Sequence, residues 1–223
     1  MDNTLNQTTY ERLKKDILTF ELKPGDIVSA QKIAQKYEVS RTPAREALVK
    51  LEAEGLVDII PQSGSVISKI DLDKVRQEWF IRTSLEMGII DDFFAHLTPL
   101  ELSRMRGYNR KMLEISKLPS TSENSYQYQL ADNLFHSVGY EVAKQQLSLT
   151  VLSGTMAHYS RLRYLTERDN RYQNRTLTGH EKLISLLEAK DVAGYKAELK
   201  IHLDHALQDI DDMKEKYPDY FII

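Results

Sequence analysis

The chain has 223 residues, of which 41% are hydrophobic and 28% charged, with a formal net charge of −3; this fits a globular protein of one large domain or two small ones. It contains no cysteine, which excludes disulfides and thiolate nucleophiles or metal ligands. The N-terminus lacks the apolar core of a signal peptide, and no apolar run approaches the roughly 20 residues of a membrane span. We therefore expect a cytoplasmic protein with no membrane partner.

The first elements predicted are a helix and a short strand. Thr8 and Glu11 have the spacing of a capping box, which predicts that the first helix begins at Thr8. Residues 23–26, with the sequence Lys-Pro-Gly-Asp, predict a turn, and residues 27–28 a short strand after it.

Two further helices and a hairpin complete the N-terminal part. The predicted N-caps of these helices are Ser29 and Ser40, and Gly55 ends the second of them. Two β-like runs, residues 56–60 and 65–68, flank Pro61-Gln62-Ser63-Gly64 and predict a hairpin. The order of these elements is the plan of a winged helix-turn-helix, in which the third helix enters the DNA major groove. We assign residues 1–69 to this domain.

The third helix separates apolar from basic side chains. At 100° per residue, its inward face consists of Ala44, Ala47, Leu48 and Leu51. To one side, near the helix N-terminus, lie Arg41, Thr42 and Arg45. Arginine offers paired donors to guanine or phosphate, and threonine adds a short polar contact. These residues and the wing tip at Gln62-Ser63-Gly64 are therefore candidate DNA contacts, although a solvated helix face would show a similar pattern.

From residue 70 to 223 the sequence predicts an all-α helical-bundle domain of about six helices. Predicted helix starts are Asp71, Thr98, Ser122 and Asp191. In the first of these helices Arg82 falls on an apolar face, where a guanidinium needs an anionic partner. Glu86, four residues on, is one candidate. The carboxylate or phosphate of a bound small molecule, gripped through two hydrogen bonds, is the other.

Three histidines and an aspartate form a candidate metal site. Asp132 and His136 stand one helical turn apart, a spacing that suits two ligands of one ion. His180 and His202 lie on apolar faces of the last two helices, almost equally far, about 16 Å, from the turn that joins them. We prefer His202 to His205, because His205 falls on the flank of the apolar face. Hydrogen-bonded core residues without a metal are the alternative.

Two stretches of sequence resemble a known family. The segments SRTPAREAL at residues 40–48 and LEAEGLV at residues 51–57 resemble the signature of GntR-family transcriptional regulators. The helical part resembles the effector-binding FCD domain of the FadR subgroup. That second resemblance is carried by Arg82 with Glu86, DNLFH at residues 132–136, and Gly179-His180-Glu181 with His202 downstream.

The resemblance implies a homodimer that binds a palindromic operator in double-stranded DNA and usually represses nearby genes, and whose DNA affinity responds to a small organic acid. Matched by position, DNA-contacting residues are Arg41, Thr42, Arg45 and Gly64. Metal ligands are Asp132, His136, His180 and His202, and Arg82 falls in the effector pocket. Imidazole and carboxylate ligands suit Zn²⁺, with Ni²⁺ or Mn²⁺ as alternatives. Gln31 stands where some relatives carry a DNA-contacting arginine.

We therefore expect a ligand-responsive repressor rather than an enzyme. Two alternatives stay open. A metal-dependent enzyme carrying a DNA-binding domain would use three histidines and a carboxylate to hold Zn²⁺ with a position left for water, but no general base at motif spacing accompanies them. A regulator with a purely structural metal would need the same four ligands.

Overall fold

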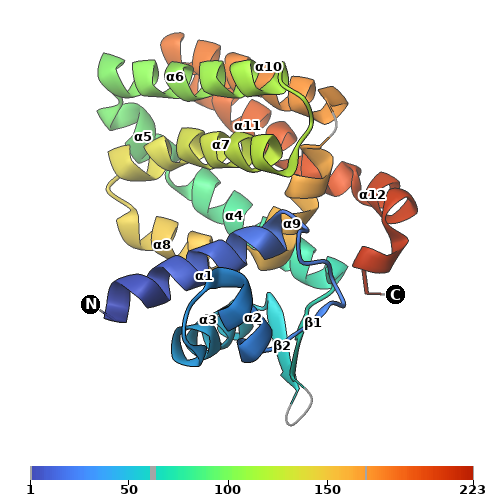
Figure 1. Cartoon of the computed structure of the whole chain (residues 1–223). Coiled ribbons are helices and arrows are strands. Elements are labelled where there is room, and N and C mark those ends of the chain that lie inside the picture. Colours follow the sequence, from blue (N-terminus) through green and yellow to red (C-terminus); the bar gives the residue numbers. More distant parts are fainter. Residues whose placement is uncertain (1, 61–63, 169, 223) are drawn as a thin grey trace.

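The computed structural model describes residues 2–60, 64–168 and 170–222. Its first part alternates helices with short strands (Figure 1): α1 (Asp2–Leu18), β1 (Ile27–Val28), α2 (Ala30–Tyr37), α3 (Arg41–Ala53), β2 (Val57–Ile60) and β3 (Gly64–Ile67). β3 is the central strand of an antiparallel sheet, in which Ile27 of β1 pairs with Val66 and Val57 of β2 pairs with Ile67. This arrangement confirms the predicted winged helix-turn-helix.

Local signals placed some element ends correctly and others not. Ser29 caps α2, since its side chain accepts a hydrogen bond from the backbone N–H of Lys32. Ser40 occupies the N-cap position of α3, but its side chain makes no capping hydrogen bond. At the other end Gly55 has a left-handed φ of 76°, and the N–H of Leu56 returns to the carbonyl of Leu51.

The predicted start of the first helix at Thr8 is wrong, because α1 already begins at Asp2. A capping box contributes only about 1 kcal/mol, which is too little to end a helix that continues in the N-terminal direction. In the hairpin, the predicted wing-tip residues Gln62 and Ser63 lie outside the described residues.

The core of the first part is apolar. Helix α3 buries the four residues expected on its inward face, Ala44, Ala47, Leu48 and Leu51. They pack against α1 and α2, chiefly through Leu13, Ile17, Ile33 and Tyr37. Burial of this stripe leaves the opposite side of α3 facing solvent.

The second part is all-helical, as predicted. Its elements are α4 (Leu72–Gly88), α5 (Ile90–His96), α6 (Pro99–Ser116), α7 (Ser122–Val142), α8 (Gln146–Thr155), α9 (Ala157–Thr166), α10 (Asn170–Glu188), α11 (Val192–Gln208), α12 (Ile210–Lys216) and a 3₁₀ turn (Pro218–Tyr220). In the described part of the chain, no helix combines the length and apolar character needed to cross a membrane.

The estimate of about six helices is too low, since the described residues form nine in this part. The reason is that three of the expected helices are bent. A single residue, Ile89, Met156 or Asp209, separates α4 from α5, α8 from α9 and α11 from α12. A period of 3.6 residues continues across such a bend, so the apolar pattern does not reveal it.

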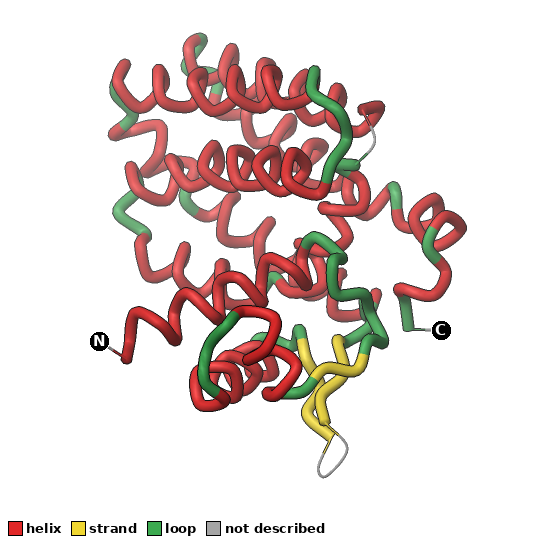
Figure 2. The backbone as a smooth tube through the Cα atoms, in the orientation of Figure 1, coloured by secondary structure: helices red, strands yellow, loops and turns green. Residues whose placement is uncertain are grey.

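The helices of the second part are stacked over the first part (Figures 1 and 2). α6 packs against both α7 and α10, and α10 packs against α11. α4 lies deeper and contacts α9 and α11. Figure 2 shows the strands gathered at the end of the molecule farthest from α6. Helix α1 runs between the two parts and contacts α9 as well as α3.

The link between the two parts is held by a buried arginine. Arg161 of α9 is completely buried and donates hydrogen bonds to the carbonyls of Ser68 and Lys69. Next to it, His158 accepts a hydrogen bond from the N–H of Asp71 over 3.0 Å. Glu78 of α4 accepts from the N–H groups of His158 and Tyr159 and so caps the start of α9. The linker therefore rests directly on the helical domain.

Candidate metal centre and nucleic-acid interface

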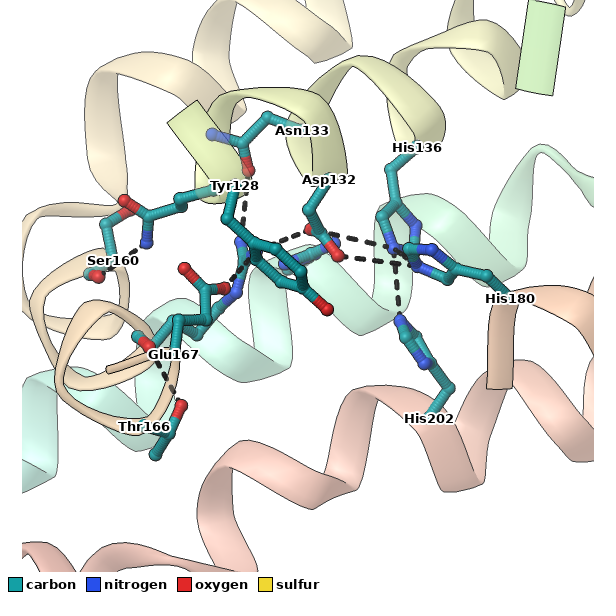
Figure 3. A network of polar contacts seen from close by, with 12 residues as sticks. Tyr128, Asp132, Asn133, His136, Ser160, Thr166, Glu167, His180 and His202 are labelled. Carbon is teal, nitrogen blue, oxygen red and sulfur yellow. Dashed lines mark hydrogen bonds and ion pairs between the residues drawn. The ribbon is translucent and has the colours of Figure 1, made fainter. Parts of the chain in front are cut away.

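Three helices bring the four predicted metal ligands together (Figure 3). α7 contributes Asp132 and His136 one turn apart, α10 contributes His180, and α11 contributes His202. His180 and His202 lie at one level of their antiparallel helices, with ring centroids 4.7 Å apart. One ligand atom from each of the four residues lies within 4.8 Å of the others.

The spacing of the ligand atoms fits one cation. The Nε2 atom of His136 lies 3.2 Å from that of His202 and 3.4 Å from that of His180. The Nε2 atom of His180 also lies 3.4 Å from Oδ1 of Asp132. Two ligands bound to one ion at about 2.0–2.1 Å lie about 3.4 Å apart in a tetrahedral arrangement. A proton satisfies only one such nitrogen–nitrogen contact at a time, whereas a cation satisfies all of them.

The protonation states also suit a metal. Burial lowers the pKa of His180 to about 4, and burial with the neighbouring imidazoles lowers the pKa of His202 well below its usual value. Burial acts to raise the pKa of Asp132, but Arg163 and His136 outweigh it, so this pKa lies well below its usual value. At neutral pH His180 and His202 thus offer neutral imidazoles and Asp132 a carboxylate, the forms that bind metal ions.

A small residue makes room for His202. Gly179 of α10 lies so close to His202 that a Cβ atom on it would stand 2.8 Å from Nδ1 of the imidazole. Any larger residue at position 179 would displace the ring. This contact explains why Gly179 precedes His180 in the sequence pattern that suggested the site.

Charged residues orient two of the ligands. Oε2 of Glu86 lies 2.8 Å from Nδ1 of His136, which leaves Nε2 of that ring directed at the cluster. Arg163 of α9 donates to Asp132 over 2.5 Å and to Glu167 over 3.1 Å. The sequence analysis missed Arg163 and Glu167. At 100° per residue, the apolar residues of 157–166 leave a gap that contains Ser160 and Arg163, so periodicity gives no signal that this arginine is buried.

The structure places His202, and not His205, beside the other three ligands. His205 is half-buried on the flank of α11, as expected, and its ring centroid lies 6.2 Å from that of His202. The described residues that cluster as possible ligands are therefore the four that the sequence indicated.

Arg82 has the internal partner that the sequence suggested. Its Nε donates to Oε1 of Glu86 over 2.6 Å, and both side chains are buried. Burial acts to raise the pKa of Glu86, but His136 and Arg82 outweigh it and lower that pKa to about 2. Glu86 therefore joins Arg82 to His136 as an ionised bridge.

A cavity of about 300 Å³ lies beside the cluster. Arg82, Glu86, His136 and Arg163 all contribute to its wall. The pairing of Arg82 with Glu86 thus does not remove Arg82 from the cavity. This volume is within the range of small-molecule sites in proteins, which begins at about 300 Å³.

The three predicted DNA contacts on α3 share one exposed surface. Arg41, Thr42 and Arg45 are all exposed in the first turns of α3. Gln31 of α2 accepts a hydrogen bond from Arg41 over 2.5 Å, so the residue that departs from the family pattern supports its neighbour. Gly64 opens β3 with a φ of 109°, a conformation that side chains rarely adopt.

Comparisons with known proteins agree with this architecture. Residues 5–67 match the family model for bacterial regulatory proteins of the gntR family, and residues 79–205 match the model for the FCD domain. The HTH-type transcriptional repressor RspR of Escherichia coli is 27% identical over 97% of this chain and 93% of its own length. The gluconate operon transcriptional repressor of Bacillus subtilis is 26% identical over 97% of this chain and 86% of its own length.

Among solved structures, E. coli McbR/YncC superposes with a TM-score of 0.78 at 19% identity, covering 96% of this chain and 98% of that one. This likeness supports the fold alone. The FCD match spans more than half of the chain, and the relatives are regulators, which supports the predicted regulator over the enzyme alternative. The chain therefore belongs to the GntR family of transcriptional regulators, within the FadR subgroup that carries an FCD domain.

Proposed function

We propose that the protein is a homodimeric repressor that binds a palindromic operator and responds to a small organic acid through a metal-containing pocket. The observation that carries this proposal is the pairing of an exposed basic surface on α3 with a buried cluster of three histidines and an aspartate beside a cavity. The division into a DNA-binding domain of residues 1–69 and an effector domain of residues 70–223, and a location in the cytoplasm, are part of the same proposal.

In the DNA-binding step, Arg41, Thr42 and Arg45 contact base edges and phosphates in the major groove, and the wing around Gly64 approaches the DNA backbone. All three α3 side chains are exposed at the end of the helix that such domains direct at DNA. Phosphate contacts release counterions, so binding should weaken steeply as salt increases.

Asp132, His136, His180 and His202 hold one divalent cation, with Zn²⁺ preferred for its match to imidazole and carboxylate ligands. When bound, the cation supplies positive charge and coordination for the carboxylate of an acid. Arg82 lines the adjoining cavity and adds a guanidinium that donates to that carboxylate. Glu86 holds Arg82 in place and stays ionised, because its pKa is about 2.

The DNA-binding step is tested by capturing genomic fragments with the purified protein and sequencing those it retains. We expect one or a few short palindromes, and we expect Arg45→Ala to weaken binding to them by about 1–3 kcal/mol per half-site. Arg110→Ala removes an exposed arginine of α6, at the opposite end of the molecule, and serves as the matched control. Equal operator affinity of Arg45→Ala and Arg110→Ala would contradict the proposed DNA surface.

The metal step is tested by calorimetric titration of chelator-treated protein with Zn²⁺. We expect one ion per chain, loss of binding in His180→Ala and retained binding in His205→Ala, which removes a neighbouring histidine outside the cluster. If His205→Ala loses the ion as well, the ligand set is wrong. A purely structural metal would stabilise the helical domain without any organic acid changing its affinity for the protein.

A further inference from the structure

The cavity beside the metal cluster is not enclosed by the effector domain alone. Its wall includes Leu18, together with Lys14 and Glu11, from α1 of the DNA-binding part. The ammonium of Lys14 is already paired with Glu54, at the C-cap of α3, over 2.6 Å. Helix α1 also packs along α3, and Leu18 contacts the apolar core that α1 and α3 form together. A molecule in this cavity therefore meets both domains.

The wall of the cavity differs in character from side to side. Arg82 of α4, His136 of α7 and Arg163 of α9 form the polar side next to the metal cluster, to which the two arginines add positive charge. Helix α8 contributes Leu149 and Leu152, and Met156 follows at its end; these residues add an apolar surface to that of Leu18. A carboxylate suits the first side, and hydrocarbon suits the second.

The size of the cavity limits the ligand further. A volume of about 300 Å³ equals that of roughly ten water molecules at about 30 Å³ each. The carboxylate of an acid as small as lactate would pair with the arginines, but the apolar surface on the other side of the cavity would stay in contact with water. A ligand that fills the cavity needs an apolar body in addition to its carboxylate.

We propose that the effector is a monocarboxylate with an apolar body, roughly ten non-hydrogen atoms in all, and that this body packs against Leu18 of α1. The inference rests on the proposed function, because it takes Arg82 and the metal cluster as the site of the carboxylate. It adds that the DNA-binding domain supplies part of the effector site. A ligand in the cavity then contacts α1 directly, and α1 packs against α3. Ligand binding can therefore change the position of α3 without any change being transmitted through the helical bundle.

The test uses the full chain loaded with Zn²⁺ and two acids, 3-phenylpropanoate and L-lactate, titrated calorimetrically. We expect 3-phenylpropanoate to bind at least about tenfold more tightly than lactate, because it buries more apolar surface. Leu18→Ala should weaken 3-phenylpropanoate about 5- to 20-fold and leave lactate unchanged. Leu147→Ala makes the same truncation on α8 at a residue that is 77% exposed and outside the cavity wall, so it should change neither affinity.

A second variant covers the case in which Leu18→Ala disturbs the fold of α1. Leu130 lines the cavity from α7 and is 37% exposed, so Leu130→Ala should fold normally and weaken 3-phenylpropanoate selectively. Equal affinities for the two acids, or equal effects of Leu18→Ala on both, would overturn this inference and leave the proposed organic-acid response intact. If neither acid binds while Zn²⁺ does, the organic-acid part of the proposed function fails as well.

Discussion

The two domains have interiors of opposite character. Among the described residues up to Ile67, the buried polar side chains are Thr9, Thr19 and Ser65, and none of them carries a charge. The helical domain instead buries many ionisable side chains: Glu78, Arg82, Glu86, Asp132, His158, Arg161, Arg163, Glu167, His180, His202 and Asp209. Burying an ion costs several kcal/mol even after relaxation, so this interior is not arranged for stability alone.

The difference indicates how each domain works. The DNA-binding domain uses its surface, and an apolar core is enough to hold α3 rigid. Under the proposed function, the helical domain uses its interior, where charged side chains meet a ligand away from water. Pairing partly offsets the cost there, as Arg163 does for Asp132. Glu167 shares the same arginine, but burial outweighs this pairing and raises the pKa of Glu167 above its usual value. Among these side chains, Arg82, Glu86 and Arg163 line the cavity, and Asp132, His180 and His202 form the cluster beside it.

The largest expected effect comes from breaking the buried ion network. Arg163→Met leaves Asp132 without its cationic partner, and we expect the free energy of unfolding to fall by about 3–5 kcal/mol in metal-free protein. Denaturant unfolding followed by circular dichroism measures the change. Arg171→Met removes an exposed arginine that pairs with Asp212 and should cost under about 1 kcal/mol. Equal effects of the two substitutions would mean that burial does not make the network costly to break.

A truncation in the apolar core should have a somewhat smaller effect and a different consequence. Leu51 of α3 is completely buried, so Leu51→Ala should destabilise the DNA-binding domain by about 2–5 kcal/mol. Operator binding should weaken accordingly, whereas Zn²⁺ affinity should not change. Val49→Ala, at a residue of α3 that is 50% exposed, is the control for stability. A loss of Zn²⁺ affinity in Leu51→Ala would show that the two interiors are not independent.

The same contrast explains what could be predicted from the sequence. Apolar periodicity identified the inward face of α3. Because His180 and His202 are almost equally far from the turn that joins their helices, the sequence also predicted that they lie side by side. Periodicity does not give the depth of a charged residue, so Arg163 and Glu167 were missed although they contact the site. It also does not reveal one-residue bends such as the one at Met156. The contribution of Leu18 to the cavity wall depends on how the two domains pack against each other, which no local sequence pattern predicts.

A smaller effect is expected where the two domains meet, at His158. Its neighbours are Asp71, Glu78, Arg161 and Lys74, and burial lowers its pKa to about 3 in the folded protein, against 6.5 ordinarily. Below pH 6.5 the unfolded chain therefore binds a proton that the folded chain does not. The stability due to neutral His158 is present above pH 6.5 and is lost as the pH falls, by about 2 kcal/mol at pH 5.

His158→Asn keeps an acceptor for the N–H of Asp71 and removes the titration. The fall in the free energy of unfolding between pH 7 and pH 5 should be smaller by about 2 kcal/mol in this variant than in the parent protein, measured by urea denaturation at both pH values. Glu78 is present in both proteins, so the difference between them reports on His158. An unchanged pH dependence would mean that the folded junction admits a proton at pH 5.

The smallest effect is expected from the exposed charges that join the domains. Lys15 of α1 pairs with Glu123 of α7 over 2.5 Å, and the two side chains are 37% and 54% exposed. Because water screens such a pair, Lys15→Ala should change the free energy of unfolding by less than about 1 kcal/mol, and added salt should reduce that change further. If the domains are held together by the buried contacts of Arg161 and the shared wall at Leu18, Lys15→Ala should also leave operator affinity unchanged. A large loss of stability or of operator affinity would mean that the exposed pair of Lys15 and Glu123, rather than the buried junction, couples the two domains.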